Sequence, residues 1–496
     1  MEIVAGLATV LGSPALLGWI VLAAFVGMVV GAIPGLTASA AIAMLLPFTF
    51  AMEPLAALAF LYVIGKSGRY GGSIAAILFN TPGTAASAAT QIDGYPLARQ
   101  GLAGKAMKVA TLSSVIGDYI GDILLILFVG GIAWIALRLG PPELFGVYMA
   151  AFVVIGSVIG ASPARGIASA AFGVLLATVG FDPITGTPRF TFGSFDLTGG
   201  FNLVPLMIGM FVIGEVLMQI ARPTEPPEVR EGEVARNRLT WGEYRPCLPH
   251  VARSSFIGAF IGMLPGLGSA IAAFVAYGEG KRRAKNALDW GNGALEGVAA
   301  PEAANNAVSG PSMAPLLTLG IPGSTIGAIL VGVFLVHGIQ IGPTLFLTNR
   351  DLVYSLFASG LVGIAAYGVI GYFGAASLGR VIARVDTKLL YPIVLLLAIG
   401  ASFATRGNMF DVWVALGAGV AGYVMRRTGL NPAAFVIAFV LTSGAEQALR
   451  QSLLLSDNGA LIFVERPVAA GFLTLAILVL VHRIYRVRRA RREVGA

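Results

Sequence analysis

The stretch "GAIPGLTASAAIAMLLPF" (31–48) places a Pro-Gly pair inside an apolar segment, and "GMLPGLGSAIAAFVAY" (262–277) does the same in the other half of the chain. Proline removes a backbone donor, and glycine opens backbone conformations that are closed to other residues. In lipid every backbone polar group has to be paired, so such a break is tolerated only where it is buried in protein or lines a wet cavity. The two stretches therefore predict helices that are interrupted inside a membrane.

The composition supports a membrane protein over its whole length. Of the 496 residues, 56% are hydrophobic and 12% are charged, and the mean hydropathy is +0.83. A soluble domain carries roughly 25% charged residues. Because a crossing helix needs about 20 apolar residues and several spans are shorter, we expect an all-α polytopic membrane protein with about 10–12 transmembrane segments, some of them re-entrant or broken.

Several classes of function are disfavoured by the same composition. The net charge of +8 comes from basic residues in short loops and at the C-terminus, as the positive-inside rule expects, so no nucleic-acid partner is predicted. Cys247 is the single cysteine, and the three histidines are scattered, so neither an internal disulfide nor a cysteine-based metal site is expected. Hydrolase and P-loop motifs are absent from the sequence, which favours a protein that is not an enzyme.

The two halves of the chain resemble each other. "FVGMVVGAIPGL" (25–36) aligns without a gap with "FIGAFIGMLPGL" (256–267). A second pair, "NTPGTAAS" (80–87) and "GIPGSTIG" (320–327), follows in the same order. Two ordered matches indicate an internal repeat of the kind found in secondary transporters.

The organisation predicted from these matches has four parts. Residues 1–221 form a first transmembrane repeat, 222–253 a polar linker, 254–485 a second transmembrane repeat and 486–496 a basic cytoplasmic tail. The charges of corresponding loops have opposite bias, which predicts that the repeats are inverted relative to each other. After the first motif the second half has basic residues in 281–285 and the first half only Glu53; after the second motif the first half is basic in 99–108 and the second half has only Arg350.

Small and hydroxylated residues follow each break. A half-helix beginning there would direct free N–H groups and a positive dipole end at an anion, and unwound carbonyls nearby could hold Na⁺. The alternative is a proline kink that serves packing alone. The candidate substrate- and ion-binding residues are Pro34, Gly35, Thr37, Ser39, Asn80, Thr81, Pro82, Gly83 and Thr84 in the first half and Pro265, Gly266, Gly268, Ser269, Pro322, Gly323, Ser324 and Thr325 in the second.

A further polar island is "GVAAPEAANNAVSGPS" (297–312). Pro301 and Glu302 suit the first turn of a helix. The amides of Asn305 and Asn306 can donate to a carboxylate or coordinate a cation, so both are added to the candidate binding residues. Capping and contacts between helices are the alternative role of this island.

Isolated charges within apolar segments are functional candidates because they are costly in lipid. Lys66 and Arg69 are possible contacts for an anionic substrate, or else side chains that reach the interface at a helix end. Asp118 and Asp122 are four residues apart and share a helix face, which suits either packing or cation binding. Glu215 lies near a helix end and is given no role.

The sequence resembles the TctA family, the large membrane subunit of tripartite tricarboxylate transporters. The resemblance covers nearly the whole chain and departs from the family at Lys66, Ser67 and Arg69, where small or uncharged residues are more usual. The stretches that carry it are "GAIPGLTASAAIAMLLPFTF" (31–50), "YGGSIAAILFNTPGTAASAATQIDGYPLARQG" (70–101), "GFDPITGTPRFTFG" (180–193), "GMLPGLGSAIAAFVAYGEGKR" (262–282), "EGVAAPEAANNAVSGPSMAPLLTLGIPGS" (296–324) and "LRQSLLLS" (449–456).

The resemblance implies a multi-pass carrier in the bacterial inner membrane that imports tri- or dicarboxylates or related organic anions, citrate-like acids among them. It implies two partners, a small four-helix membrane subunit and a periplasmic solute-binding protein. It also implies symport driven by a Na⁺ or H⁺ gradient, with no other cofactor. The alternatives are an organic-anion carrier that acts alone and a channel, which would need a continuous polar ring or filter.

Overall fold

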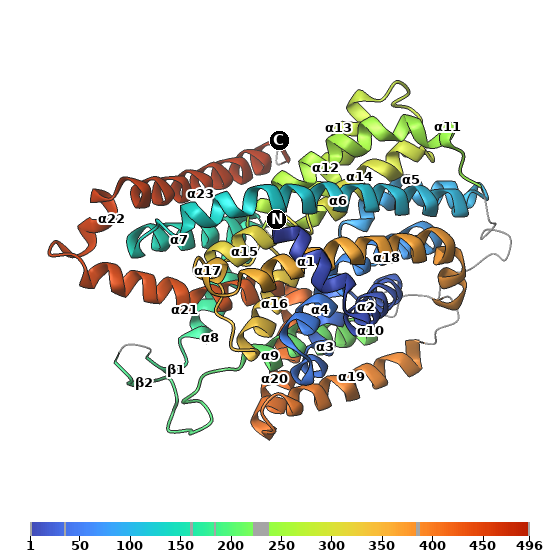
Figure 1. The fold of residues 1–496 in the computed structure, drawn as a ribbon. Helices are drawn as coiled ribbons and strands as arrows, with labels where there is room; N and C mark the ends of the chain where they lie inside the picture. Colours follow the sequence, from blue (N-terminus) through green and yellow to red (C-terminus); the bar gives the residue numbers. More distant parts are fainter. Residues whose placement is uncertain are drawn as a thin grey trace.

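The computed structural model of the chain describes residues 2–33, 36–158, 162–182, 185–221, 238–382 and 387–494. These residues form helices joined by short connections, with one two-stranded antiparallel ribbon (Figure 1). The first half contains α1 (Glu2–Leu11), α2 (Pro14–Ala32), α3 (Ala38–Leu45), η1 (Leu46–Ala51), α4 (Pro54–Phe79), α5 (Ser87–Arg99), α6 (Ala103–Ala136), α7 (Pro141–Val158), α8 (Pro163–Ala177), β1 (Gly180–Phe181), β2 (Pro188–Arg189), α9 (Leu203–Met207), η2 (Ile208–Ile213) and α10 (Gly214–Ala221).

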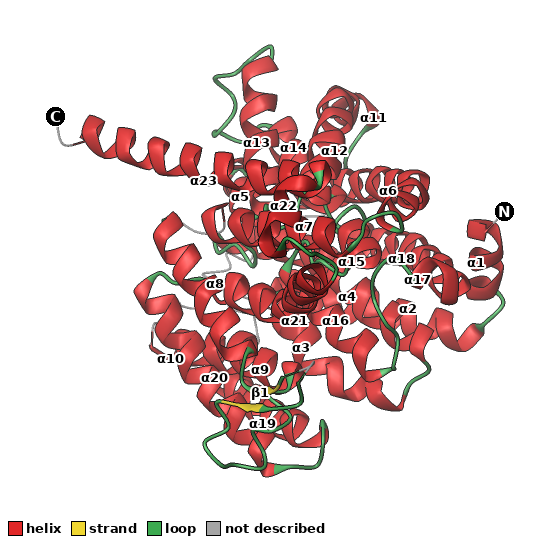
Figure 2. Cartoon of the chain, turned by 90° about the vertical axis from the view of Figure 1, so that its left-hand side faces the viewer, coloured by secondary structure: helices red, strands yellow, loops and turns green. Residues whose placement is uncertain are grey.

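The second half continues the same architecture. In Figure 2 its helix α21 is seen nearly end-on near the middle of the molecule, and the β1–β2 ribbon and α19 lie at the lower end of the view. Its elements are α11 (Trp241–Tyr244), η3 (Arg245–Cys247), α12 (Leu248–Met263), α13 (Gly268–Arg283), α14 (Leu295–Ala307), α15 (Met313–Leu319), α16 (Thr325–Val336), α17 (Leu345–Thr348), α18 (Arg350–Ile382), α19 (Thr387–Ala404), α20 (Met409–Thr428), α21 (Pro432–Leu454), η4 (Gly459–Leu461), α22 (Ile462–Glu465) and α23 (Pro467–Val494).

Membrane-spanning helices are present in both halves. Within the described residues five helices are long and apolar enough to cross a membrane, and a sixth span results if the bent pair 459–465 and 467–483 is counted as one. Other apolar helices are shorter because the chain breaks them. The prediction of an all-α polytopic membrane protein with broken helices is therefore confirmed, whereas the inverted relation of the halves stays a prediction.

Each Pro-Gly motif separates two helices. Helix α2 ends at Ala32 and α3 begins at Ala38, and α12 ends at Met263 while α13 begins at Gly268. The second motif of each half lies in the same way between α4 and α5 and between α15 and α16. By contrast, residues 103–136 form one continuous helix, α6.

One expected helix start is wrong. Pro301 lies inside α14, which begins six residues earlier at Leu295. Proline removes one hydrogen-bond donor from the helix interior, and surrounding helices make such a loss tolerable in membrane proteins. Glu302 is therefore held in mid-helix and fully buried, rather than at an exposed first turn.

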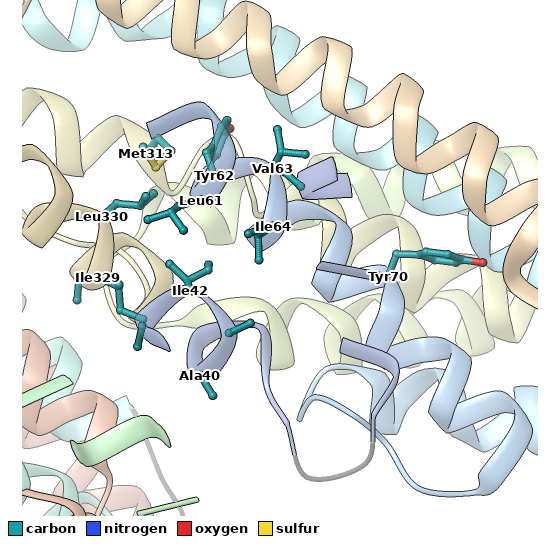
Figure 3. Packing of buried hydrophobic residues seen from close by; sticks show 14 of the residues in the cluster. Ala40, Ile42, Leu61, Tyr62, Val63, Ile64, Tyr70, Met313, Ile329 and Leu330 are labelled. Atoms are coloured by element: carbon teal, nitrogen blue, oxygen red, sulfur yellow. The ribbon is translucent and has the colours of Figure 1, made fainter. Parts of the chain in front are cut away.

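Helices from the two halves of the sequence pack against each other in the core. Helix α14 lies against α6, and α18 lies against α4, α6 and α2. Close to the breaks, Figure 3 shows Ile42 of α3 beside Ile64 of α4 and Ile329 of α16, three side chains that are at most 1% exposed. The broken segments are thus anchored by ordinary apolar packing, which fixes where their ends lie.

Small residues allow α6 and α14 to approach closely, as is common between membrane helices. A Cβ atom on Gly117 would overlap the backbone of Ala303, whereas one on Gly131 of the same helix would meet no atom within 4 Å. We expect Gly117→Ala to destabilise the purified chain by about 1–3 kcal/mol through overpacking. Gly131→Ala is the matched control and should stay within about 1 kcal/mol of wild type. Thermal melting in detergent measures both, and equal melting of the two variants would contradict this packing.

Candidate functional site

The breaks of both halves meet at one cavity of about 600 Å³. The first half contributes residues from both of its motifs, and so does the second half. The predicted site residues that line the cavity are Thr37, Ser39, Arg69, Thr84, Gly266, Gly268, Ser269, Gly323, Ser324 and Thr325. Segments almost 300 residues apart in sequence are thereby brought to one volume, as expected for a two-fold site built from repeated motifs.

Four of the helix N-termini at this cavity follow the predicted breaks, and each reaches it through residues at or just before its first turn. The hydroxyl of Thr37 accepts a hydrogen bond from the Ala40 amide at the start of α3 (3.1 Å), and the hydroxyl of Ser324 accepts one from the Gly327 amide at the start of α16 (3.1 Å). The hydroxyl of Thr84 accepts from the Ser87 amide at the start of α5 (3.1 Å). Helix α13 begins at Gly268 itself. The partial positive charges of these ends add up to a volume that favours an anion.

Within each half the two breaks touch. In the second half the Gly266 amide donates to the Gly323 carbonyl (3.2 Å), and Gly266 adopts a φ of +83° that favours glycine. In the first half a Cβ atom on Gly83 would overlap the carbonyl oxygen of Gly31. The glycines of the motifs therefore allow backbone segments to approach closely, and this contact fixes the helix ends around the cavity.

Arg69 is the one predicted cation that reaches the cavity. Its side chain extends from the middle of α4 and is 6% exposed. One guanidinium nitrogen donates to the carbonyl of Asn305 over 3.4 Å, and Nε has no partner among the described residues. A guanidinium has five donors in a planar fork that matches a carboxylate. Most of that donor capacity is unspent here, and buried donors without acceptors are costly, so the site suits an anionic ligand.

The amides of the polar island are buried beside this arginine and are not among the lining residues. Asn306 donates to the hydroxyl of Ser114 (2.8 Å) and to the carbonyl of Glu302 (3.0 Å). Both polar atoms of the Asn305 side chain lack a partner among the described residues. Glu302 accepts from Ser73 and Ser114, at 2.5 and 2.8 Å, and also from Thr90. These contacts link α14 to α4, α5 and α6.

The remaining predicted residues lie elsewhere. Asn80 caps α4 in a left-handed conformation (φ 55°) and accepts from Gln91. Lys66 forms ion pairs with Asp118 and Asp122, one turn of α4 away from Arg69. Five others do not line the cavity but lie within three residues of lining residues in sequence: Thr81, Pro82, Gly83, Pro265 and Pro322. Pro34 and Gly35 lie outside the described residues.

Two lining charges were not predicted. Arg426 of α20 and Glu215 of α10 form an ion pair (3.1 Å) at the cavity, although the sequence gave Glu215 no role. Asn431 also lines the cavity and caps α21 by accepting from the Ala433 amide (2.8 Å). The signal that was available is one acidic and one basic residue at the ends of two otherwise apolar segments.

A second, larger cavity of about 930 Å³ lies between α8 and α20. Its lining side chains are all apolar and include Phe172, Trp413 and Phe435. Its lining side chains carry no charge that could hold an ion, so the smaller, polar cavity is the candidate site.

Broken helices whose ends converge on one polar cavity define this chain as a multi-pass helical membrane protein with an internal anion-compatible site. Residues 17–437 match the family model described as "Tripartite tricarboxylate transporter TctA family". The chain belongs to this family of transporters, which implies a tripartite system with other subunits.

Two relatives come from Agrobacterium vitis. The "Uncharacterized 52.8 kDa protein in TAR-I ttuC' 3'region" is 34% identical over 481 residues, which cover 97% of this chain and 95% of the relative. The "Uncharacterized protein in TAR-II ttuC' 3'region" is 34% identical over 236 residues, which cover 48% of this chain and 97% of the relative. No solved structure was found to match the chain.

Proposed function

We propose that this chain is the large carrier subunit of a binding-protein-dependent secondary transporter that imports tri- or dicarboxylates or related organic anions by ion symport. The observation that carries the proposal is Arg69, a buried guanidinium with one long hydrogen bond, at a cavity that helix N-termini from both halves of the chain face. A carboxylate at this position would accept hydrogen bonds from the planar guanidinium and from amides in the first turns of these helices. The Arg426–Glu215 pair at the same cavity is neutral overall, so the lining side chains carry one net positive charge, that of Arg69.

The size of the cavity agrees with this class of substrate. A volume of about 600 Å³ lies within the range of sites for small molecules, about 300–1,000 Å³. Membership of a tripartite family supports a small four-helix membrane subunit and a periplasmic solute-binding protein as partners in a bacterial inner membrane. The driving force we propose is a Na⁺ or H⁺ gradient.

Reconstitution tests the proposal directly. The chain would be placed in liposomes with its small membrane subunit, and its binding protein would be added outside with labelled citrate or succinate. We expect uptake only when the binding protein and an imposed ion gradient are both present. Omitting each component in turn is the control.

Two other outcomes of the uptake experiment would identify a different kind of transport protein. Uptake without the binding protein would indicate a carrier that acts alone. Flux that follows the anion gradient and ignores every ion gradient would indicate a channel. Either result would contradict the proposed tripartite symporter.

A further inference from the structure

A buried charge cluster lies between α4, α6 and α18, beside the cavity. The ammonium group of Lys66 contacts a carboxylate oxygen of Asp118 at 2.7 Å and one of Asp122 at 2.8 Å. The hydroxyl of Tyr367 donates to the second oxygen of Asp118 (3.1 Å). All of these side chains are at most 1% exposed. Charges so deeply buried are retained only where they balance or serve a function.

Arg69 lines the cavity and lies on the same helix, α4, as Lys66 of the cluster. Arg69 is one helical turn from Lys66, whose ammonium group contacts both aspartates. Lys66 and Arg69 together supply two positive charges, and Asp118 and Asp122 supply two negative charges, so the set is neutral. An anion bound to Arg69 would engage the guanidinium that balances this set, and one negative charge would be left in excess.

Asp122 is the group that can neutralise this excess negative charge by binding a proton. Its Oδ1 atom accepts from Lys66 and, at 3.4 Å, from the hydroxyl of Tyr62, a residue of α4 shown in Figure 3. Its Oδ2 atom is buried and has no hydrogen-bond partner among the described residues. A free carboxylate oxygen in such surroundings is costly, and a bound proton removes both its charge and its unmet demand for a donor.

The other titratable groups around Asp122 already have hydrogen-bond partners. Tyr119 of α6 donates to the Leu361 carbonyl, and Tyr367 of α18 donates to Asp118. Glu302 of α14 is the next carboxylate, near Ser114 two turns along α6, and three hydroxyl groups donate to it. Its oxygens therefore already have donors, whereas Oδ2 of Asp122 has none.

We propose that Asp122 is a proton-binding site linked to the anion site through Arg69, so that one proton is bound with each anion. This inference rests on the proposed function and names its coupling ion. The proton adds to Oδ2 of Asp122 and converts the carboxylate into a neutral acid. By linkage the effect is reciprocal: anion binding favours the proton, and the affinity for the anion rises as the pH falls, by at most tenfold per pH unit.

Packing around Asp122 favours a proton over a metal ion. A Cβ atom on Gly360 would lie 3.0 Å from Oδ2, and one on Gly310 would overlap Oδ1. Hard cations need several oxygen ligands in a shell, whereas a proton needs only the carboxylate oxygen itself. Among the described residues, no group of three acidic, histidine or cysteine side chains is placed to hold a metal.

Isothermal titration calorimetry of the purified full chain tests the linkage. Citrate and succinate are titrated in two buffers of different ionisation enthalpy, because the difference in heat counts the protons bound with the anion. We expect uptake of about one proton per anion by wild type, after correction for the proton equilibria of the probe, and close to none by Asp122→Asn. Glu302→Gln is the control and should keep the uptake.

Three outcomes of the titration would contradict the proton site at Asp122. Anion binding without proton uptake by wild type, or with uptake that persists in Asp122→Asn, would overturn the proton site and leave the carrier function standing. Binding that needs Na⁺ and takes up no proton would replace the proton with sodium. If neither probe binds to wild type, the proposed substrate class fails, and this inference fails with it. The wild-type titration is informative even if a variant does not fold.

Discussion

Replacing Arg69 with glutamine is expected to weaken the binding of citrate or succinate to the purified chain by roughly 30-fold or more. Removing one partner of a buried, hydrogen-bonded charge pair costs about 2–5 kcal/mol, and each 1.4 kcal/mol corresponds to about tenfold in affinity. Glutamine keeps polar atoms but loses the positive charge and the planar fork. Arg69→Lys restores the charge without the fork, so it should recover part of the affinity. Calorimetric titration measures the affinity of wild type, Arg69→Gln and Arg69→Lys for the anion.

The fold should survive this change. Arg69 makes one long hydrogen bond to the protein, at 3.4 Å, whereas Lys66 contacts two carboxylates directly, so the loss of Arg69 should cost less stability than the loss of Lys66. Arg427→Gln is the matched control, because Arg427 is an exposed arginine of α20 that donates a hydrogen bond to the hydroxyl of Tyr423 (3.1 Å). Equal affinity of Arg69→Gln and Arg427→Gln for the anion would show that the guanidinium of Arg69 does not hold the ligand. Elution and melting in detergent check that both variants are folded.

The fold was predictable from sequence because its decisive signals are local. Apolar segments mark the spans, and the Pro-Gly pairs at 265–266 and 322–323 mark the breaks by their own backbone chemistry. The positions of the hydroxyl groups followed from the same logic, since Thr37 and Ser324 stand where an N-terminal cap is needed. That the motifs of both halves line one cavity agrees with what a repeat predicts.

The charges near the site were predictable only in part because their roles depend on contacts between distant helices. Lys66 and Arg69 are three residues apart and looked alike in sequence, yet one is paired and the other faces the cavity. Asp118 and Asp122 share a face of α6, but their partner lies 52 and 56 residues away on α4. Arg426 and Glu215 likewise meet across two helices. No local pattern specifies which residue pairs with which.

Replacing Lys66 with methionine is expected to destabilise the chain by about 3–5 kcal/mol, the cost of breaking a buried ion pair from one side. Methionine fills a similar volume, so the loss is mainly electrostatic. Asp118 and Asp122 would both keep their negative charges in the core without the ammonium group that contacts each of them. Thermal melting of the detergent-purified chain at neutral pH measures the effect.

Restoring the charge balance should restore stability. In Lys66→Met combined with Asp118→Asn, one of the two unpaired carboxylates is gone, so the double variant is expected to melt above Lys66→Met alone. If the two changes were independent, their costs would add, so recovery shows that the residues are coupled through the ion pair. The melting point of Lys66→Met should also rise as the pH falls, because a proton on either carboxyl removes the excess charge. A single variant as stable as wild type, or a double variant less stable than the single one, would contradict the view that Lys66 balances these carboxylates.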